Sequence, residues 1–188
     1  MHMANRVRKF WTFEELESLP DDGNKYELIH GELFVTPPPT NSHETILARI
    51  TRILDAYVAA HDLGYVYRPR SVIRVTPNTE VEPDLMVRQP SEGLDWHEAP
   101  LPILVAEVAS DSTRRRDRVH KRGLYTELGI PEYWMIDGDD RTVCVARPDR
   151  DDTTTDSQLV WHPEGPEVPL VISLSDIFAP LPSSRQPR

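Results

Sequence analysis

The apolar run at residues 103–109, with the sequence ILVAEVA, most constrains how this chain can fold. Apolar side chains at consecutive positions are typical of a central strand that is covered on both faces. Glu107 interrupts the run. Removing an ionised carboxylate from water is costly, so this glutamate needs a cation beside it. Two interpretations stay open at this point: a structural ion pair with a buried arginine, or a carboxylate that faces a cleft and binds a metal ion.

A polar turn and a basic helix follow this strand, and the helix is expected to end at Gly129. One stripe of the helix has the spacing i, i+4, i+7 and i+11 and consists of Asp117, Lys121, Leu124 and Leu128. Because the stripe becomes apolar toward its end, Lys121 is predicted to lie where the helix enters the core. A lysine at the rim, with its ammonium in water, is the alternative.

Arginines surround the same helix on a chain whose net charge is -10. That charge argues against a protein coated by nucleic acid, but it leaves room for a local basic patch. A solvated helix face is the ordinary interpretation of these arginines. They are also the best candidates in this chain for contacts with phosphates, and the candidates are Arg114, Arg115, Arg118 and Arg122.

A second acidic candidate comes from residues 80–88, where apolar and polar side chains alternate as in a strand. Asp84 lies on the polar face and follows Pro83. An exposed edge strand is the ordinary interpretation, although a proline also fits a bend at an active site. Asp84 and Glu107 on neighbouring strands would offer hard oxygen ligands, which favour Mg²⁺ or Mn²⁺. Zinc is not expected, because Cys144 stands alone and no histidine pair has ligand spacing.

Capping and turn residues divide the rest of the chain into short elements. Helices are expected at residues 12–19, with Thr12 as the cap, and at residues 42–61, with Ser42 as the cap. The acidic stretch at residues 149–156 is expected to be an exposed loop. Strands are expected around a His30-Gly31 turn in residues 26–36 and at residues 66–75, 80–88, 103–110, 132–137, 142–148, 157–162 and 169–174. This order predicts an α/β or α+β domain with a mixed sheet.

Length and composition indicate the domain organisation and the cellular compartment. With 188 residues and 38% hydrophobic side chains, residues 10–180 are expected to form a single domain. Residues 1–9 are expected to be an N-terminal extension, in which Met1 and His2 precede a native start at Met3. Residues 181–188 are expected to be a disordered tail. No run is long and apolar enough for a membrane span or an export signal, and the single cysteine suits a reducing compartment, so a cytoplasmic protein is expected.

Five motifs over residues 10–179 together resemble the Uma-type restriction endonuclease family, a bacterial group within the PD-(D/E)XK nuclease superfamily. In chain order they read TFEELESLP, YELIHGELFVTPPP followed by His43, VEPDLMV, LVAEVASDSTRRRDRVHKRGLY and GIPEYWMID. Each motif is weak alone, but their number and order make a specific match. The resemblance implies a restriction-endonuclease-like core flanked by helices.

The resemblance also implies roles for individual residues. Asp84 corresponds to the aspartate of the superfamily's Pro-Asp pair, and Glu107 corresponds to its acidic strand residue. Where the superfamily has a lysine, two positions after the acidic residue, this chain has Ala109. Lys121 matches a lysine that the family carries on the next helix.

Glu27 and His43 match family positions near the site, although an exposed strand position and an ordinary helix residue are the simpler interpretations. The resemblance thus implies a metal-dependent endonuclease that hydrolyses DNA, with Mg²⁺ or Mn²⁺ held by Asp84, Glu107 and the carbonyl of Val108. Two alternatives stay open: a non-catalytic interaction module on a nuclease fold, and a hydrolase of another phosphate ester. Pairing into a homodimer is a further expectation from nucleases of this type.

Overall fold

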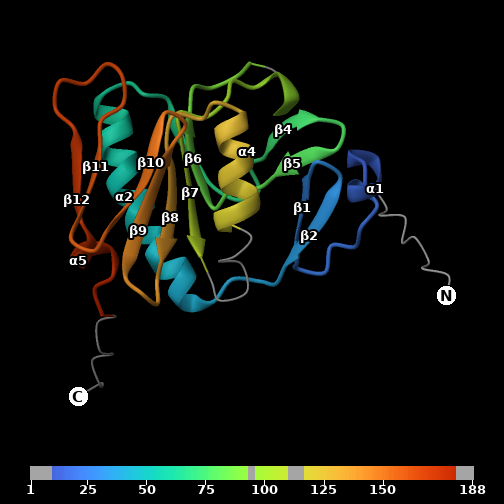
Figure 1. The fold of residues 1–188 in the computed structure, drawn as a ribbon, viewed down its shortest axis with the longest axis horizontal. Coiled ribbons are helices and arrows are strands. Elements are labelled where there is room, and N and C mark those ends of the chain that lie inside the picture. Colours follow the sequence, from blue (N-terminus) through green and yellow to red (C-terminus); the bar gives the residue numbers. More distant parts are fainter. Residues whose placement is uncertain (1–9, 93–95, 110–116, 181–188) are drawn as a thin grey trace.

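A mixed sheet of six strands forms the centre of the protein in this computed structural model, which describes residues 10–92, 96–109 and 117–180 (Figure 1). The strands lie in the order β10-β9-β8-β7-β6-β3. β7 and β8 run parallel, and the other neighbouring pairs of this sheet are antiparallel. The predicted mixed sheet is therefore confirmed. Its strands are β3 (Tyr65–Tyr67), β6 (Leu85–Arg88), β7 (Leu104–Ala109), β8 (Tyr133–Asp137), β9 (Thr142–Arg147) and β10 (Arg150–Thr155).

A second sheet of four antiparallel strands lies beside the first, in the order β2-β1-β5-β4 (Figure 1). Its first hairpin turns at His30 and Gly31, which have positive φ angles of 51° and 80°. Such angles are typical of a two-residue hairpin turn whose backbone twist matches the twist of the two flanking strands. This hairpin is as predicted. The strands are β1 (Lys25–Ile29), β2 (Glu32–Thr36), β4 (Ile73–Thr76) and β5 (Thr79–Val81).

The helix α1 (Phe13–Glu17) begins where the capping residues predict. The side chain of Thr12 accepts a hydrogen bond from the backbone N–H of Glu15, and the Glu15 carboxylate accepts one from the backbone N–H of Thr12. This capping box satisfies two N–H groups that have no partner inside the helix. α1 packs beside β1 at the outer end of the small sheet (Figure 1).

The long helix α2 (Asn41–Ala60) covers one face of the large sheet. Its N-cap is Thr40, whose hydroxyl accepts the N–H of His43, so the prediction of Ser42 as the cap is wrong by two residues. Thr40 has an extended backbone, and its side chain can therefore reach the first helical turn. No helix in the described part of the chain has the length and apolar character that crossing a bilayer requires.

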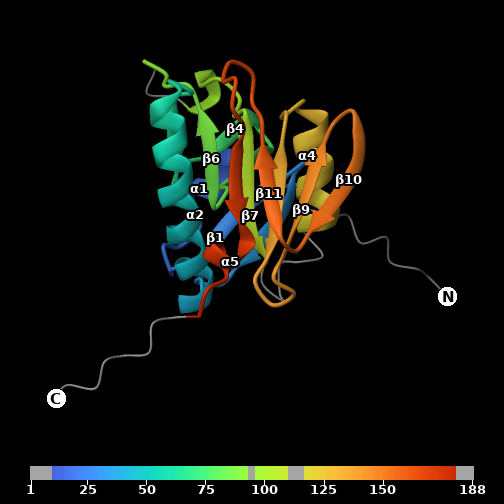
Figure 2. The same cartoon turned by 90° about the vertical axis from the view of Figure 1, so that its left-hand side faces the viewer.

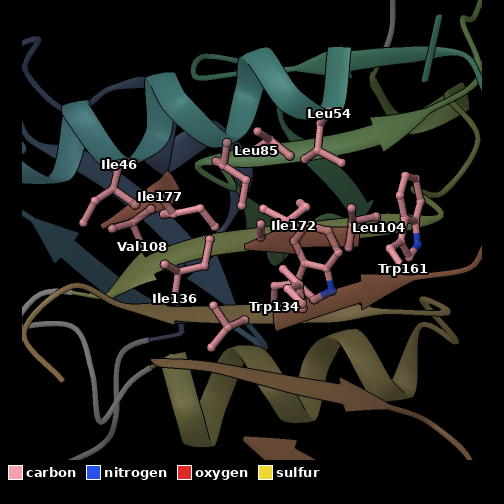
Figure 3. Packing of buried hydrophobic residues seen from close by; sticks show 14 of the residues in the cluster. Ile46, Leu54, Leu85, Leu104, Val108, Trp134, Ile136, Trp161, Ile172 and Ile177 are labelled. Atoms are coloured by element: carbon pink, nitrogen blue, oxygen red, sulfur yellow. The ribbon is translucent and has the colours of Figure 1, made fainter. Parts of the chain in front are cut away.

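A two-stranded hairpin packs on the same face as α2 (Figure 2). It consists of β11 (Gln158–Trp161) and β12 (Leu170–Ser173), and the short helix α5 (Leu174–Ile177) follows it. Figure 3 shows the core between these elements and the large sheet, in which the labelled side chains are Ile46, Leu54, Leu85, Leu104, Val108, Trp134, Ile136, Trp161, Ile172 and Ile177.

The opposite face of the large sheet is covered by the connection between β7 and β8 together with the small sheet. That connection includes a π-helical turn at Asp117–Lys121 and the helix α4 (Arg122–Glu127). A second apolar cluster lies here and includes Val105, Leu124 and Tyr125. Side chains alternate between the two faces of a strand, and Val105 and Val108 belong to different clusters. Glu107 therefore points to the same side as Val105, toward α4 and the small sheet.

Two of the predicted strands are each split between the two sheets. The predicted strand at residues 80–88 divides at Pro83 into β5 and β6, and the predicted strand at residues 66–75 divides into β3 and β4. Pro83 has no N–H to donate, so it interrupts the ladder and allows the chain to turn. Asp84 follows at the point where the chain passes from the small sheet to the large one.

The prediction of an exposed loop at residues 149–156 is wrong. β10 (Arg150–Thr155) occupies this segment and pairs with β9 at the edge of the large sheet. Its side chains are exposed or half-buried, as expected of an edge strand that has solvent on both faces. An acidic composition alone therefore did not distinguish this edge strand from a loop.

Replacing Gly64 by alanine should destabilise the protein by about 2–4 kcal/mol. Gly64 has a φ of 102°, and a Cβ there would lie 2.3 Å from the backbone oxygen of Arg88. Gly129→Ala is the matched control, because Gly129 has a φ of 68° with open space around it and should lose about 1–2 kcal/mol from strain alone. Urea denaturation of both variants measures the difference, and equal losses would contradict a clash at Gly64.

Candidate active site

The candidate site lies where the two sheets meet, and residues from β1, α2, the segment before β6, β7 and the helical connection converge there. Glu107 is 2% exposed at the centre of β7. Its Oε1 atom accepts hydrogen bonds from the Lys121 ammonium at 2.5 Å and from the Tyr125 hydroxyl at 3.1 Å. Among the described residues, the cation that the buried glutamate required is thus a lysine from the next helix.

Lys121 joins this glutamate to a second one. Its ammonium lies 2.9 Å from Oε1 of Glu27, and the same oxygen accepts the backbone N–H of Glu82 at 3.0 Å. Neither Lys121 nor Glu27 is exposed. The alternatives of a rim lysine at 121 and an exposed strand glutamate at 27 are therefore both wrong, because packing of α4 and β1 against the large sheet encloses the pair.

Asp84 is the centre of a second group of contacts and is 6% exposed. Its Oδ2 atom accepts the backbone N–H of Val108 at 2.9 Å and lies 3.0 Å from Nε2 of His43. His43 reaches this position from the first turn of α2, where its backbone N–H is held by the Thr40 cap. The structure therefore brings together Asp84, Glu107, Val108, His43, Glu27 and Lys121, all of which were candidates from the sequence.

Lys25 is a site residue that the sequence reasoning missed. Its ammonium donates to Oδ1 of Asp84 at 3.1 Å and to the carbonyl oxygen of Glu82 at 3.0 Å, and it lies 3.9 Å from Oε2 of Glu107. The predicted strand began one residue too late to include it. Lys25 and Glu27 are two positions apart in β1 and share one face of that strand, and this spacing was the signal that could have identified it.

A cleft of about 850 Å³ opens onto this group of residues. Its wall includes Lys25, His43, Asp84, Glu107 and Val108. Within the described part of the chain, Lys121 and Glu27 do not contribute to that wall and lie behind it. The cleft is of a size that admits a small molecule or a segment of a larger substrate.

The charges around Asp84 set its protonation. Burial raises the pKa of its carboxyl group, but the charge of Lys25, the hydrogen bond from His43 and the charge of Lys121 outweigh burial and hold the pKa below its usual range. Burial lowers the pKa of Lys25, and the charges of Glu27, Glu107 and Asp84 more than compensate, so that the pKa is raised. The carboxylate and the ammonium are therefore both charged near neutral pH.

The same carboxylates also shift the pKa values of His43 and Tyr125. Burial lowers the pKa of the His43 imidazole, whereas its hydrogen bond to Asp84 and the charge of that carboxylate raise it. The second effect is larger, so the pKa of His43 lies above its usual value. Burial raises the pKa of Tyr125, and the charge of Glu107 raises it further. Tyr125 is therefore a neutral phenol that donates a hydrogen bond to Glu107.

Of the four arginines considered as phosphate contacts, the structure describes the side chain of Arg122 alone. Arg114 and Arg115 lie outside the described residues, and for Arg118 the structure describes the backbone alone. Arg122 forms an ion pair with Asp152 of β10, with a shortest distance of 2.7 Å. Arg122 is not among the residues that line the cleft.

The donor atoms at the cleft suit a hard divalent ion. Across the described residues, no group of three or more His, Cys, Asp or Glu side chains is arranged as a ready metal cage. Mg²⁺ does not need one, because it is commonly held by one or two carboxylates and completes its shell with waters and substrate phosphates. Asp84 and Glu107 supply those carboxylates. Val108 directs its N–H to Asp84, and in an extended strand its carbonyl points to the same side.

Comparisons with known proteins identify the fold and the family of the chain. A solved structure of "a putative nuclease belonging to DUF820" from Anabaena variabilis ATCC 29413 is similar, with a TM-score of 0.71 and 20% sequence identity, over 89% of this chain and 97% of that one. At this identity the likeness shows the fold, which is nuclease-like with a restriction-endonuclease-like core. No curated protein matches the chain. A family model described as "Putative restriction endonuclease" matches residues 13–179, and the chain therefore belongs to the Uma2 family.

Proposed function

We propose that this protein is a metal-dependent endonuclease that hydrolyses phosphodiester bonds of DNA with Mg²⁺ or Mn²⁺. One observation carries the proposal: Asp84, which directly precedes β6, and Glu107 of the neighbouring β7 line one cleft and lie within 4 Å of a single ammonium group. Two carboxylates that share one cation can also share a divalent ion. The family description and the nuclease-like fold support DNA as the substrate.

In this proposal Asp84, Glu107 and the carbonyl of Val108 hold the ion, and the residues around them fix its ligands. His43 and the Val108 N–H orient Asp84 through its Oδ2 atom. Lys121 and Tyr125 orient Glu107 through its Oε1 atom. Partners of this kind hold metal ligands in position and commonly matter for affinity and rate.

When bound, Mg²⁺ or Mn²⁺ polarises the phosphate and makes a bound water more acidic. The chain's own contribution is to place negative oxygens on one wall of the cleft and positive groups beside them. Glu27 serves as an outer residue that keeps Lys121 against Glu107. Lys25 lines the cleft, so its charge can neutralise the negative charge that develops on the phosphate oxygens.

Supercoiled plasmid tests this proposal directly. We expect wild type to nick plasmid in Mg²⁺ or Mn²⁺ and to lose the activity when EDTA removes the ion. Asp84→Ala and Glu107→Ala, prepared in the same way, should leave the plasmid intact. Equal nicking by all three proteins would identify a contaminant and overturn the assignment.

A non-catalytic interaction module on the same fold is the competing hypothesis. Calorimetric titration with Mn²⁺ separates the two, because the endonuclease requires binding that disappears in Asp84→Ala and Glu107→Ala. Binding that persists in both variants, or no binding by wild type, would favour the module. If Mn²⁺ binds as expected but plasmid stays intact, a panel of other phosphate esters tests the remaining hydrolase hypothesis.

A further inference from the structure

Lys25 places its ammonium among the oxygens that the proposed function assigns to the metal ion. The ammonium contacts Oδ1 of Asp84 at 3.1 Å and the carbonyl oxygen of Glu82 at 3.0 Å, with Oε2 of Glu107 at 3.9 Å. Its side chain is 16% exposed and borders the cleft. A compact cation surrounded by carboxylate and carbonyl oxygens has the same type of surroundings as a hard divalent ion.

In each of the two carboxylates, the contacts described above hold one oxygen, and Lys25 is nearest to the other. In Asp84, Oδ2 is held by Val108 and His43, whereas Oδ1 contacts Lys25. In Glu107, Oε1 is held by Lys121 and Tyr125, whereas Oε2 is the atom nearest to Lys25. The oxygens that face Lys25 belong to residues of the cleft wall, where an ion would enter.

The two lysines of the site therefore have different positions. Lys121 is fully buried behind the wall and holds Glu107 from the side away from the cleft. Lys25 stands on the cleft side, and an ammonium and a metal ion cannot occupy the same place. We propose that Lys25 is a tethered counter-ion that occupies the metal position and competes with the divalent ion for Asp84 and Glu107. This inference rests on the proposed function.

Charge and space favour such an exchange. Among the described residues, Asp84 and Glu107 place two carboxylates beside the Lys25 ammonium. A divalent ion in the place of Lys25 would bring one more positive charge to these two carboxylates. The displaced lysine chain remains attached to β1 at the border of a cleft of about 850 Å³, which has room for it. The apparent affinity for metal then equals the intrinsic affinity multiplied by the fraction of protein in which Lys25 has left the site.

The test is calorimetric titration of the metal-free full chain with Mn²⁺ alone. Lys25→Met keeps the length of the side chain and removes its charge, and it should bind Mn²⁺ at least about tenfold more tightly than wild type. Arg70→Met is the matched control, because Arg70 also lines the cleft, but its side chain is 75% exposed and pairs with Asp21. Removing that charge should change the Mn²⁺ affinity by less than about twofold.

Lys25→Gln serves as a second neutral variant, so that the test does not depend on the folding of one protein. Each variant is also measured with Asp84→Asn, which should abolish the binding in every background. Mn²⁺ affinities of Lys25→Met and Lys25→Gln equal to or weaker than wild type, with binding still dependent on Asp84, would overturn the competition and leave the proposed function standing. Binding by wild type that does not depend on Asp84 would overturn the proposed function itself, and the competition with it.

Discussion

Glu107→Gln should lower the rate of plasmid nicking by about 100-fold or more while leaving the protein folded. Glutamine has the shape of glutamate, and its amide oxygen can still accept hydrogen bonds from Lys121 and Tyr125. The charge that the proposed metal site requires is lost. The initial rate of nicking in saturating Mg²⁺, together with the thermal unfolding midpoint, measures both parts of this expectation.

Glu132→Gln is the control for this experiment. Glu132 is also a buried carboxylate, with Trp134 and Arg147 as partners, but it does not line the cleft. It should nick plasmid at a rate close to that of wild type. A Glu107→Gln protein that remains as active as Glu132→Gln would show that the charge of Glu107 is not needed for the reaction.

Lys121→Met should reduce the free energy of unfolding by about 3–5 kcal/mol. The ammonium of Lys121 is completely buried and lies between Glu27 and Glu107. Methionine fills most of the volume but removes the positive charge that lies between these two buried carboxylates. Urea denaturation in EDTA measures this loss without a contribution from metal binding.

A double variant shows whether the loss comes from charge or from packing. In Lys121→Met combined with Glu27→Gln, one of the two carboxylates that face the lost charge is replaced by a neutral amide, so the variant should be at least about 1 kcal/mol more stable than the sum of the single losses predicts. Strict additivity of the two substitutions would contradict the coupling of Lys121 to Glu27 and would assign the loss to packing.

Several features of the fold could be predicted because their causes are local. The capping box at Thr12 and the His30-Gly31 turn depend on residues within a few positions of each other, and both are as expected. The strand around Glu107 could be predicted from its apolar run. The edge strand β10 could not, because an exposed edge tolerates the same polar residues as a loop.

The sequence by itself determined the family, the order of most elements and the requirement that a buried Glu107 have a cation. The tertiary structure decided which cation meets which oxygen. Lys25 lies 59 positions from Asp84, and His43 lies 41 positions from it. Such contacts depend on how the small sheet and α2 pack against the large sheet, and no periodicity within one element contains that information. For this reason the position of Lys121, where the helix enters the core, could be predicted from the sequence. The position of Lys25 at the cleft became evident only from the folded structure.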